Sequence, residues 1–420
     1  MDSLKTLKID RRLFFLAFLL VAVFLHARTF SQPIIDWDEA VYLYLSEHMD
    51  WGWGHYSTQG SFIDNALSSR VYSAEVFYHP PVIPYLIKVL SVALPQFLAA
   101  KLLNLVFSLA SFYFVFKIAN ALSDIRGAAI AVSLWALCPV FNLESNLVHL
   151  DFPMTFFILA GVWYFIDYRE NRFDLKKLVL SGMAFVLAML TKYTGPIYVL
   201  IPVLLVACQN EIHGKWKHVG LYAGILALGF GWWVFVFLKY GSLMPAEFVG
   251  HVEGRARFTS PYIESVGLRS WYHVWLYFLA ICPLFALYLH GAGRAVLKTK
   301  KTVRAFYGLP PALGMLIALN TASVLAVLTF NGVNIVGGTN DWALRHNLPF
   351  LPVVYVTLGY IMTNLFKEEN PRRNAGVIVW GFFTLVVMSF STYNSLMAEG
   401  NLRALPALLL WVPGLADLFH

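Results

Sequence analysis

The sequence predicts an all-α integral membrane protein whose chain crosses the bilayer many times. Charged residues make up 13% of its 420 residues, and hydrophobic residues make up 59%. Soluble domains carry about 25% charged residues, so this chain has roughly half the usual share. A soluble core of this size would also show polar faces at helical or strand period, whereas long windows of this sequence contain none.

Apolar runs of span length follow one another along the chain. A bilayer core of about 30 Å requires about 20 apolar residues in a helix. Residues 82–98 are apolar but contain Pro84 and Lys88, so they form either a further span or a helix lying in the membrane interface. With or without them, we expect about 11–13 transmembrane helices. The other predicted spans cover approximately residues 13–30, 101–121, 127–145, 152–168, 178–194, 196–209, 218–238, 271–290, 307–330, 347–366, 375–393 and 403–419.

The basic residues indicate the orientation of these spans. The net charge is +7, but lysine and arginine gather in short loops between apolar runs, which is typical of cytoplasmic loops. This distribution accounts for the basic charge, so we expect no nucleic-acid partner. If residues 82–98 lie in the interface, the large basic clusters all share the side of the N-terminus. The first apolar run lacks a small-residue cleavage site, which favours an uncleaved first helix and a cytoplasmic N-terminus.

The cysteines give no sign of disulfide bonds or of metal binding. The three cysteines lie inside or at the ends of apolar runs, so they indicate neither a disulfide framework nor a metal site. They are Cys138, Cys208 and Cys282.

Two motifs lie in the first predicted outer loop, residues 31–81. "DWDEAVYLYLSEHM" (36–49) has apolar residues at helical spacing and predicts a short amphipathic helix. Asp36 and Asp38 fall at its start, where free N–H groups and the helix dipole favour a carboxylate. Helix capping alone would explain one such acid. With Glu39, however, three acids directly follow a membrane exit, which favours a functional cluster. In "VFYHPPVIPYL" (76–86), two prolines stiffen the chain and hold His79 beside the membrane.

These motifs, in this order, resemble the GT-C superfamily of integral-membrane glycosyltransferases. The branch they resemble contains protein O-mannosyltransferases and aminoarabinose lipid A transferases. Three later stretches resemble the same branch. "LVHLDFPMTFFILAGVWYF" (147–165) is similar to its second outer loop, "LTKYTGPIYVL" (190–200) to its K-x-x-G span, and "LRHNLPFLPVVYVTLG" (344–359) to its arginine-led helix start. The resemblance covers most of residues 10–365.

The resemblance implies a GT-C fold with short interfacial helices in the first outer loop. It also implies inverting transfer of a sugar from a polyprenyl-phosphate donor to a lipid, glycan or protein acceptor at the outer or luminal face. Residues 1–366 would form the catalytic membrane domain, with a second large outer loop at 239–270. Residues 367–420 would add transmembrane helices to which we assign no role. A bacterial or archaeal plasma membrane is favoured over the endoplasmic reticulum, and the sequence identifies neither sugar nor acceptor.

The resemblance also assigns roles to residues. The general base of the family corresponds to Asp38, with Glu39 its neighbour and Asp151 a second acidic element; the alternative for Asp151 is a helix cap before Pro153. Such a displacement requires a base for the acceptor hydroxyl and positive charge near the phosphate. Arg345 matches an arginine of the family, and arginine binds phosphate in a bidentate manner. Headgroup contact is the alternative for each cation. The expected substrate-binding residues are Tyr78, His79, His149, Lys192, Arg255, Arg257 and Arg345.

We expect no cofactor. The spacing of Asp36 and Asp38 could hold a divalent metal, but the branch generally works without one, so helix capping is the favoured interpretation of Asp36. The alternative functions are a transporter or flippase of a lipid-linked sugar and a non-catalytic partner subunit. A transporter predicts ionisable residues within spans and two similar halves. This chain has few charges within spans and no visible duplication, and its acids lie at the outer ends of spans. The Asp38–Glu39 pair argues against a non-catalytic subunit, so an enzyme is predicted.

Overall fold

A computed structural model describes four stretches of the chain, and every regular element in them is helical. The all-α prediction is therefore confirmed for these residues. The described residues are 37–49, 80–198, 214–241 and 348–367, with isolated positions at 203, 282, 286–287, 379, 381, 383–384, 386 and 388.

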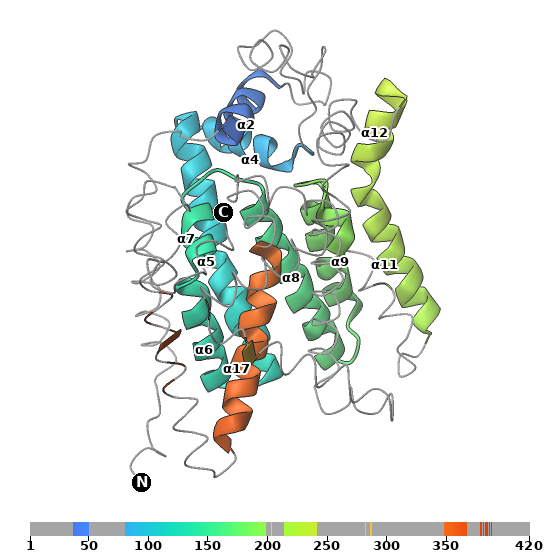
Figure 1. Ribbon diagram of the computed structural model, residues 1–420. Helices are drawn as coiled ribbons and strands as arrows, with labels where there is room; N and C mark the ends of the chain where they lie inside the picture. The colour runs from blue at the N-terminus through green and yellow to red at the C-terminus, as the bar shows by residue number, and fades with distance from the viewer. Residues whose placement is uncertain are drawn as a thin grey trace, which may run out of the picture.

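A bundle of helices forms the body of the described structure (Figure 1). Helix α8 packs against both α5 and α9, and α17, which is distant in sequence, packs against α6. Helix α11 (Lys215–Gly229) packs on the outer side of α9, and α12 (Gly231–Tyr240) follows it. The bundle comprises α5 (Gln96–Leu122), α6 (Ile125–Ala136), α8 (Asp151–Glu170), α9 (Leu175–Met189) and α17 (Leu351–Lys367).

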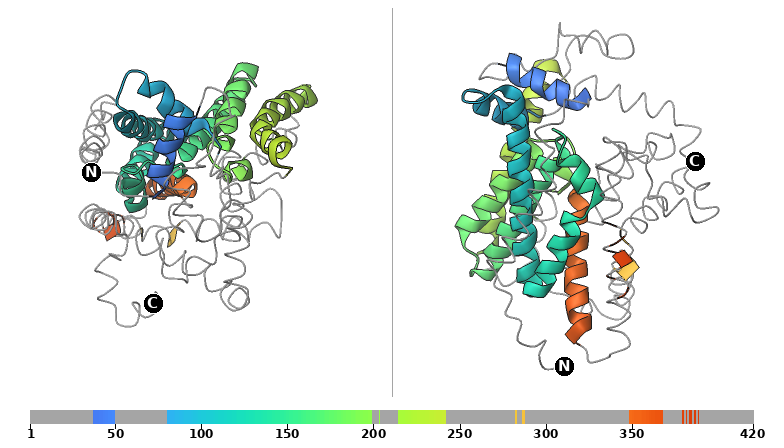
Figure 2. Two further views of the ribbon diagram at one scale, coloured as in Figure 1. Left: turned by 90° about the horizontal axis from the view of Figure 1, so that it is seen from above. Right: turned by 90° about the vertical axis from the view of Figure 1, so that its left-hand side faces the viewer.

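Two short helices lie over one end of this bundle, which we call the α2 end. Helix α2 (Trp37–His48) packs against α4 (Val82–Ser91). In Figure 2, the right-hand view shows α2 at the top of the bundle, and the left-hand view, from above, shows it lying across the bundle. Helices α5 and α8 begin at the α2 end, and α9 ends there (Figure 1). The short helix predicted for residues 36–49 is therefore present.

Helix α4 is too short to cross a bilayer alone. Its 10 residues rise about 15 Å, against about 30 Å of hydrocarbon. The side chain of Lys88 donates a hydrogen bond to the carbonyl of Met49 next to α2. Helix α5 already begins at Gln96, directly after Pro95. These observations favour the non-spanning interpretation of residues 82–98.

The described residues include some of the predicted membrane spans. Within the described residues, α5 is long and apolar enough to cross a membrane, and α11 with α12 would form a second span bent by 44°. The span predicted at 218–238 corresponds to this bent pair, in which the chain bends at Phe230, between Gly229 and Gly231. The span predicted at 127–145 is wrong as a single helix. It divides into α6 and α7 (Pro139–Glu144), since a proline cannot continue the hydrogen bonding of the preceding helix.

An aromatic cluster joins four of the helices. The ring of Trp135 lies 4.5 Å from that of Phe141 and 6.3 Å from that of Tyr355, and the Phe141 and Phe152 rings lie 5.2 Å apart. The indole N–H of Trp135 donates to Ser111 Oγ at 3.1 Å. Such ring pairs contribute about 0.5–1.5 kcal/mol beyond their buried area. The cluster ties α6, α7, α8 and α17 together, and α5 joins them through Ser111.

Helices α6 and α17 approach each other closely at two glycines. A Cβ atom on Gly359 would lie 2.3 Å from the carbonyl oxygen of Gly127, and a Cβ on Gly127 would lie 3.0 Å from Thr363 Oγ1. Small residues at such contacts allow two backbones to pack directly in membrane proteins.

We expect Gly359→Ala to destabilise the protein by about 1–3 kcal/mol, because the added methyl group must push the α6 backbone away. Thermal unfolding in detergent measures the effect. Gly224→Ala is the matched control, since a Cβ at Gly224 on α11 meets no atom within 4 Å. Equal unfolding temperatures for the two variants would contradict the close contact between α6 and α17.

Candidate active site

The first predicted acids lie at the start of α2, at the α2 end of the bundle. Asp38 and Glu39 occupy the first turn of the helix, and their exposed fractions are 4% and 0%. Backbone N–H groups at a helix start favour such carboxylates. Burial of two adjacent acids is costly unless other groups compensate their charge, so the surroundings of this turn decide what it can do.

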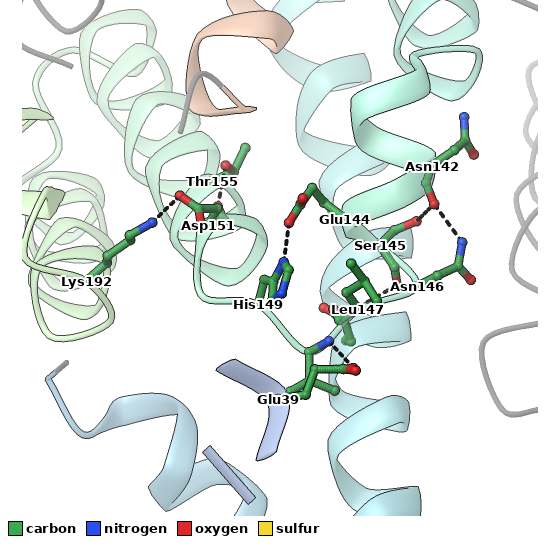
Figure 3. Close-up of polar contacts among 12 residues, drawn as sticks. Glu39, Asn142, Glu144, Ser145, Asn146, Leu147, His149, Asp151, Thr155 and Lys192 are labelled. Atoms are coloured by element: carbon green, nitrogen blue, oxygen red, sulfur yellow. Dashed lines mark hydrogen bonds and ion pairs between the residues drawn. The ribbon is translucent and has the colours of Figure 1, made fainter. Parts of the chain in front are cut away.

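Glu39 is anchored by a lysine that sequence reasoning missed. The ammonium of Lys101, on α5, lies 2.9 Å from Glu39 Oε1, and both side chains are fully buried. The same carboxylate oxygen accepts the backbone N–H of Val148 at 2.8 Å (Figure 3). Glu39 thus links α2 to α5 and to the segment before α8. The span predicted from residue 101 onward makes Lys101 a boundary residue, whereas α5 begins five residues earlier and buries it.

A second buried pair lies in that segment. His149 Nδ1 and Glu144 Oε2 are 2.6 Å apart, and each side chain is 3% exposed. Figure 3 shows the pair between the Glu39 contact and Asp151. Glu144 was also missed; the available signal was an acid within "NLESNLVHLD", a polar stretch between two apolar runs.

The second predicted acid, Asp151, is paired with the predicted Lys192. Asp151 Oδ1 lies 2.5 Å from the ammonium of Lys192, and both are buried. Asp151 is the first residue of α8, and Leu150 occupies the capping position, so the capping interpretation of Asp151 is not supported. Lys192 follows the end of α9. Its buried ion pair also argues against simple headgroup contact for this lysine.

The structure therefore gathers five of the predicted residues at the α2 end. Asp38 and Glu39 come from α2. His149 lies just before α8, Asp151 is the first residue of α8, and Lys192 lies three residues after the end of α9. Six predicted residues lie outside the described residues and stay predictions: Asp36, Tyr78, His79, Arg255, Arg257 and Arg345.

The arrangement is a set of buried, mostly neutralised charges. Each lysine faces one carboxylate, which is how proteins keep ionised groups away from water. Among the described residues, no three His, Cys, Asp or Glu side chains group closely enough to hold a metal ion. The site can hold carboxylates, one imidazole and two ammonium groups in fixed positions, which suits proton transfer and hydrogen bonding to a hydroxyl-rich substrate.

Comparison with known proteins identifies the class of fold. ArnT from Cupriavidus metallidurans, solved with undecaprenyl phosphate, superposes with a TM-score of 0.52 at 14% identity, over 96% of this chain and 75% of ArnT. Its apo structure gives 0.52 at 14% identity, over 94% and 66%. A mutant of the arabinofuranosyltransferase AftD from Mycobacteria gives 0.50 at 17% identity, over 94% of this chain but 28% of AftD. The chain has the GT-C fold of membrane glycosyltransferases, as predicted.

A family model matches part of the chain. Residues 78–235 match the model of the dolichyl-phosphate-mannose-protein mannosyltransferase family, which confirms the predicted resemblance to this branch over those residues. The match includes α5, α8 and α9, and with them Lys101, His149, Asp151 and Lys192. No curated protein sequence matches the chain.

Proposed function

We propose that this protein is an inverting glycosyltransferase that uses a polyprenyl-phosphate sugar as donor. The observation that carries the proposal is the burial of two acidic elements, Asp38–Glu39 and Asp151, at the same end of a GT-C helical bundle, where Glu39 accepts the N–H of Val148 in the segment that leads to Asp151. The family match points to the same donor class. The acceptor is a hydroxyl or phosphate group of a lipid, glycan or protein.

In the proposed reaction, the Asp38 carboxylate takes the proton from the acceptor hydroxyl. The acceptor oxygen then forms a bond to the anomeric carbon of the sugar. The bond between that carbon and the phosphate oxygen breaks, and polyprenyl phosphate leaves with the electron pair. One displacement inverts the anomeric configuration. General-base catalysis of this kind contributes about 10²–10⁴-fold to a rate.

We assign the Asp151–Lys192 pair to orientation of the donor sugar. A carboxylate accepts and an ammonium donates hydrogen bonds, so the pair can hold sugar hydroxyls in one pose. Its burial excludes water that would otherwise compete for these contacts. His149, held by Glu144 at 2.6 Å, would contact the substrate from the same segment.

The phosphate of the donor needs positive charge when it leaves. We assign this role to Arg345, Arg255 and Arg257, with Tyr78 and His79 beside the lipid. Arginine suits it because its planar guanidinium binds two phosphate oxygens at once. The proposal places the site at the outer or luminal face of the membrane, with the N-terminus in the cytoplasm.

The experiment is sugar transfer by the purified protein. Polyprenyl phosphates carrying mannose, aminoarabinose, galacturonic acid or hexosamine would be offered with lipid, glycan and peptide acceptors. We expect one donor to be consumed, with polyprenyl phosphate released in step with product and the anomeric configuration inverted. Retained configuration would contradict single displacement with Asp38 as base.

A further inference from the structure

One turn of α5 carries two buried polar residues that the proposed reaction does not use directly. Lys101 and Asn104 are three positions apart, so they lie on the same side of the helix. Their exposed fractions are 0% and 3%. Both sit in the first turns of α5, at the α2 end. We call these two residues the α5 polar turn.

The α5 polar turn holds a short irregular segment by its backbone. Lys101 donates to the carbonyl of Asn146 at 2.9 Å. Asn104 donates to the carbonyls of Ser145 at 2.5 Å and Leu147 at 2.8 Å. The next residue of the segment, Val148, donates its N–H to Glu39, which is itself paired with Lys101.

Four consecutive residues, 145–148, are thus bonded by side chains from α5 and α2. Buried backbone groups outside regular structure must find such partners, and here one helical turn and one carboxylate supply them. The segment leads through His149 and Leu150 into Asp151, and Glu39 directly follows Asp38. The same bonds therefore connect both acidic elements to α5.

We propose that Lys101 and Asn104 are positioning residues that fix Asp38 relative to Asp151. This inference rests on the proposed function, in which those two acids act on one donor and acceptor. A buried ion pair contributes little to stability compared with well-packed apolar residues, which favours a positional role for Lys101 and Glu39. Catalytic groups must be held within about 0.5 Å of their productive geometry, and supporting hydrogen bonds achieve this.

Two variants test the inference without leaving a lone buried charge. Asn104→Leu removes the bonds to Ser145 and Leu147 while keeping the size of the side chain. The double variant Glu39→Gln with Lys101→Met removes both charges, while an amide oxygen at position 39 can still accept the Val148 N–H. Lys117→Met is the matched control. Lys117 lies farther along α5, over the rings of Tyr113 and Trp163.

The first readout separates kcat from KM for the donor that the wild type consumes. We expect both test variants to lower kcat by about 100-fold, as misplacement by about 1 Å does, with KM nearly unchanged because the groups that bind the donor are still present. Lys117→Met should match the wild type in both constants. A kcat equal to that of the wild type in both test variants would overturn the inference.

The second readout needs no substrate. Spin labels at Glu47→Cys on α2 and Glu170→Cys on α8, both exposed positions, report the distance between the two helices in a background lacking Cys208. We expect one narrow distance distribution in the wild type and in Lys117→Met, and a broader or shifted one in both test variants. Unchanged distributions would overturn the inference even if activity fell. If the wild type transfers no sugar, the proposed function fails, while this measurement still decides whether the α5 polar turn positions α2 against α8.

Discussion

Replacing Asp38 with asparagine should lower sugar transfer by about 10²–10⁴-fold, the range that general-base catalysis contributes. Asparagine has nearly the same shape and can occupy the same buried place in the first turn of α2, but its amide cannot accept the proton of the acceptor hydroxyl. We therefore expect kcat to fall while the unfolding temperature in detergent stays close to that of the wild type. Initial rates of labelled-sugar transfer measure the effect.

The matched control for this experiment lies on the same helix. Glu47 is exposed near the other end of α2, so Glu47→Gln makes the same carboxylate-to-amide change away from the proposed site. It should leave transfer unchanged. Full activity of Asp38→Asn would contradict the assignment of the base and direct attention to Asp36, Glu39 or Asp151.

The second large expected effect is a loss of folding stability when Lys192 is replaced. Lys192→Met removes the lysine that pairs with the buried Asp151 carboxylate, and breaking such a pair costs about 3–5 kcal/mol. The double variant Asp151→Asn with Lys192→Met removes both charges, so it should unfold at a higher temperature than Lys192→Met alone. If Asp151 orients the donor, the double variant should nevertheless transfer sugar poorly. Thermal unfolding and transfer rates together separate the two roles.

A second lysine–aspartate pair on neighbouring helices provides the control. Lys177 lies 2.6 Å from Asp167, but its side chain is 31% exposed. Solvent screens partly exposed pairs, which contribute little to stability, so Lys177→Met should have a small effect. Equal losses for Lys192→Met and Lys177→Met would show that burial of the Asp151–Lys192 pair has no energetic consequence, and the account of that pair would be wrong.

The sequence predicted the helices well where an apolar run was uninterrupted. The runs at 152–168 and 347–366 correspond to α8 (Asp151–Glu170) and α17 (Leu351–Lys367). Internal breaks were not predicted, because Pro139 and the glycines on either side of Phe230 interrupt helices whose hydropathy continues. Hydropathy measures the transfer of side chains to lipid and is insensitive to such changes of backbone geometry.

The candidate site was predictable only in part. The acids of α2 and α8 stood out because carboxylates are rare in this chain and both follow apolar runs. Lys101 did not stand out, because its partner Glu39 is 62 residues away and nothing local in either segment indicates the pairing. The contacts of residues 145–148 are backbone contacts, which are independent of the identity of the side chains there. Such long-range bonds become visible only in the folded chain.

We propose that this protein moves sugar from a lipid phosphate to an acceptor rather than moving the lipid-linked sugar across the membrane. The most direct test of this proposal is the fate of a doubly labelled donor, with one label on the sugar and another on the polyprenyl chain, in proteoliposomes containing the purified protein. We expect the two labels to separate, with the sugar label on the acceptor and the other on free polyprenyl phosphate. Labels that stay together while the intact donor crosses the bilayer would contradict the proposal and identify a transporter.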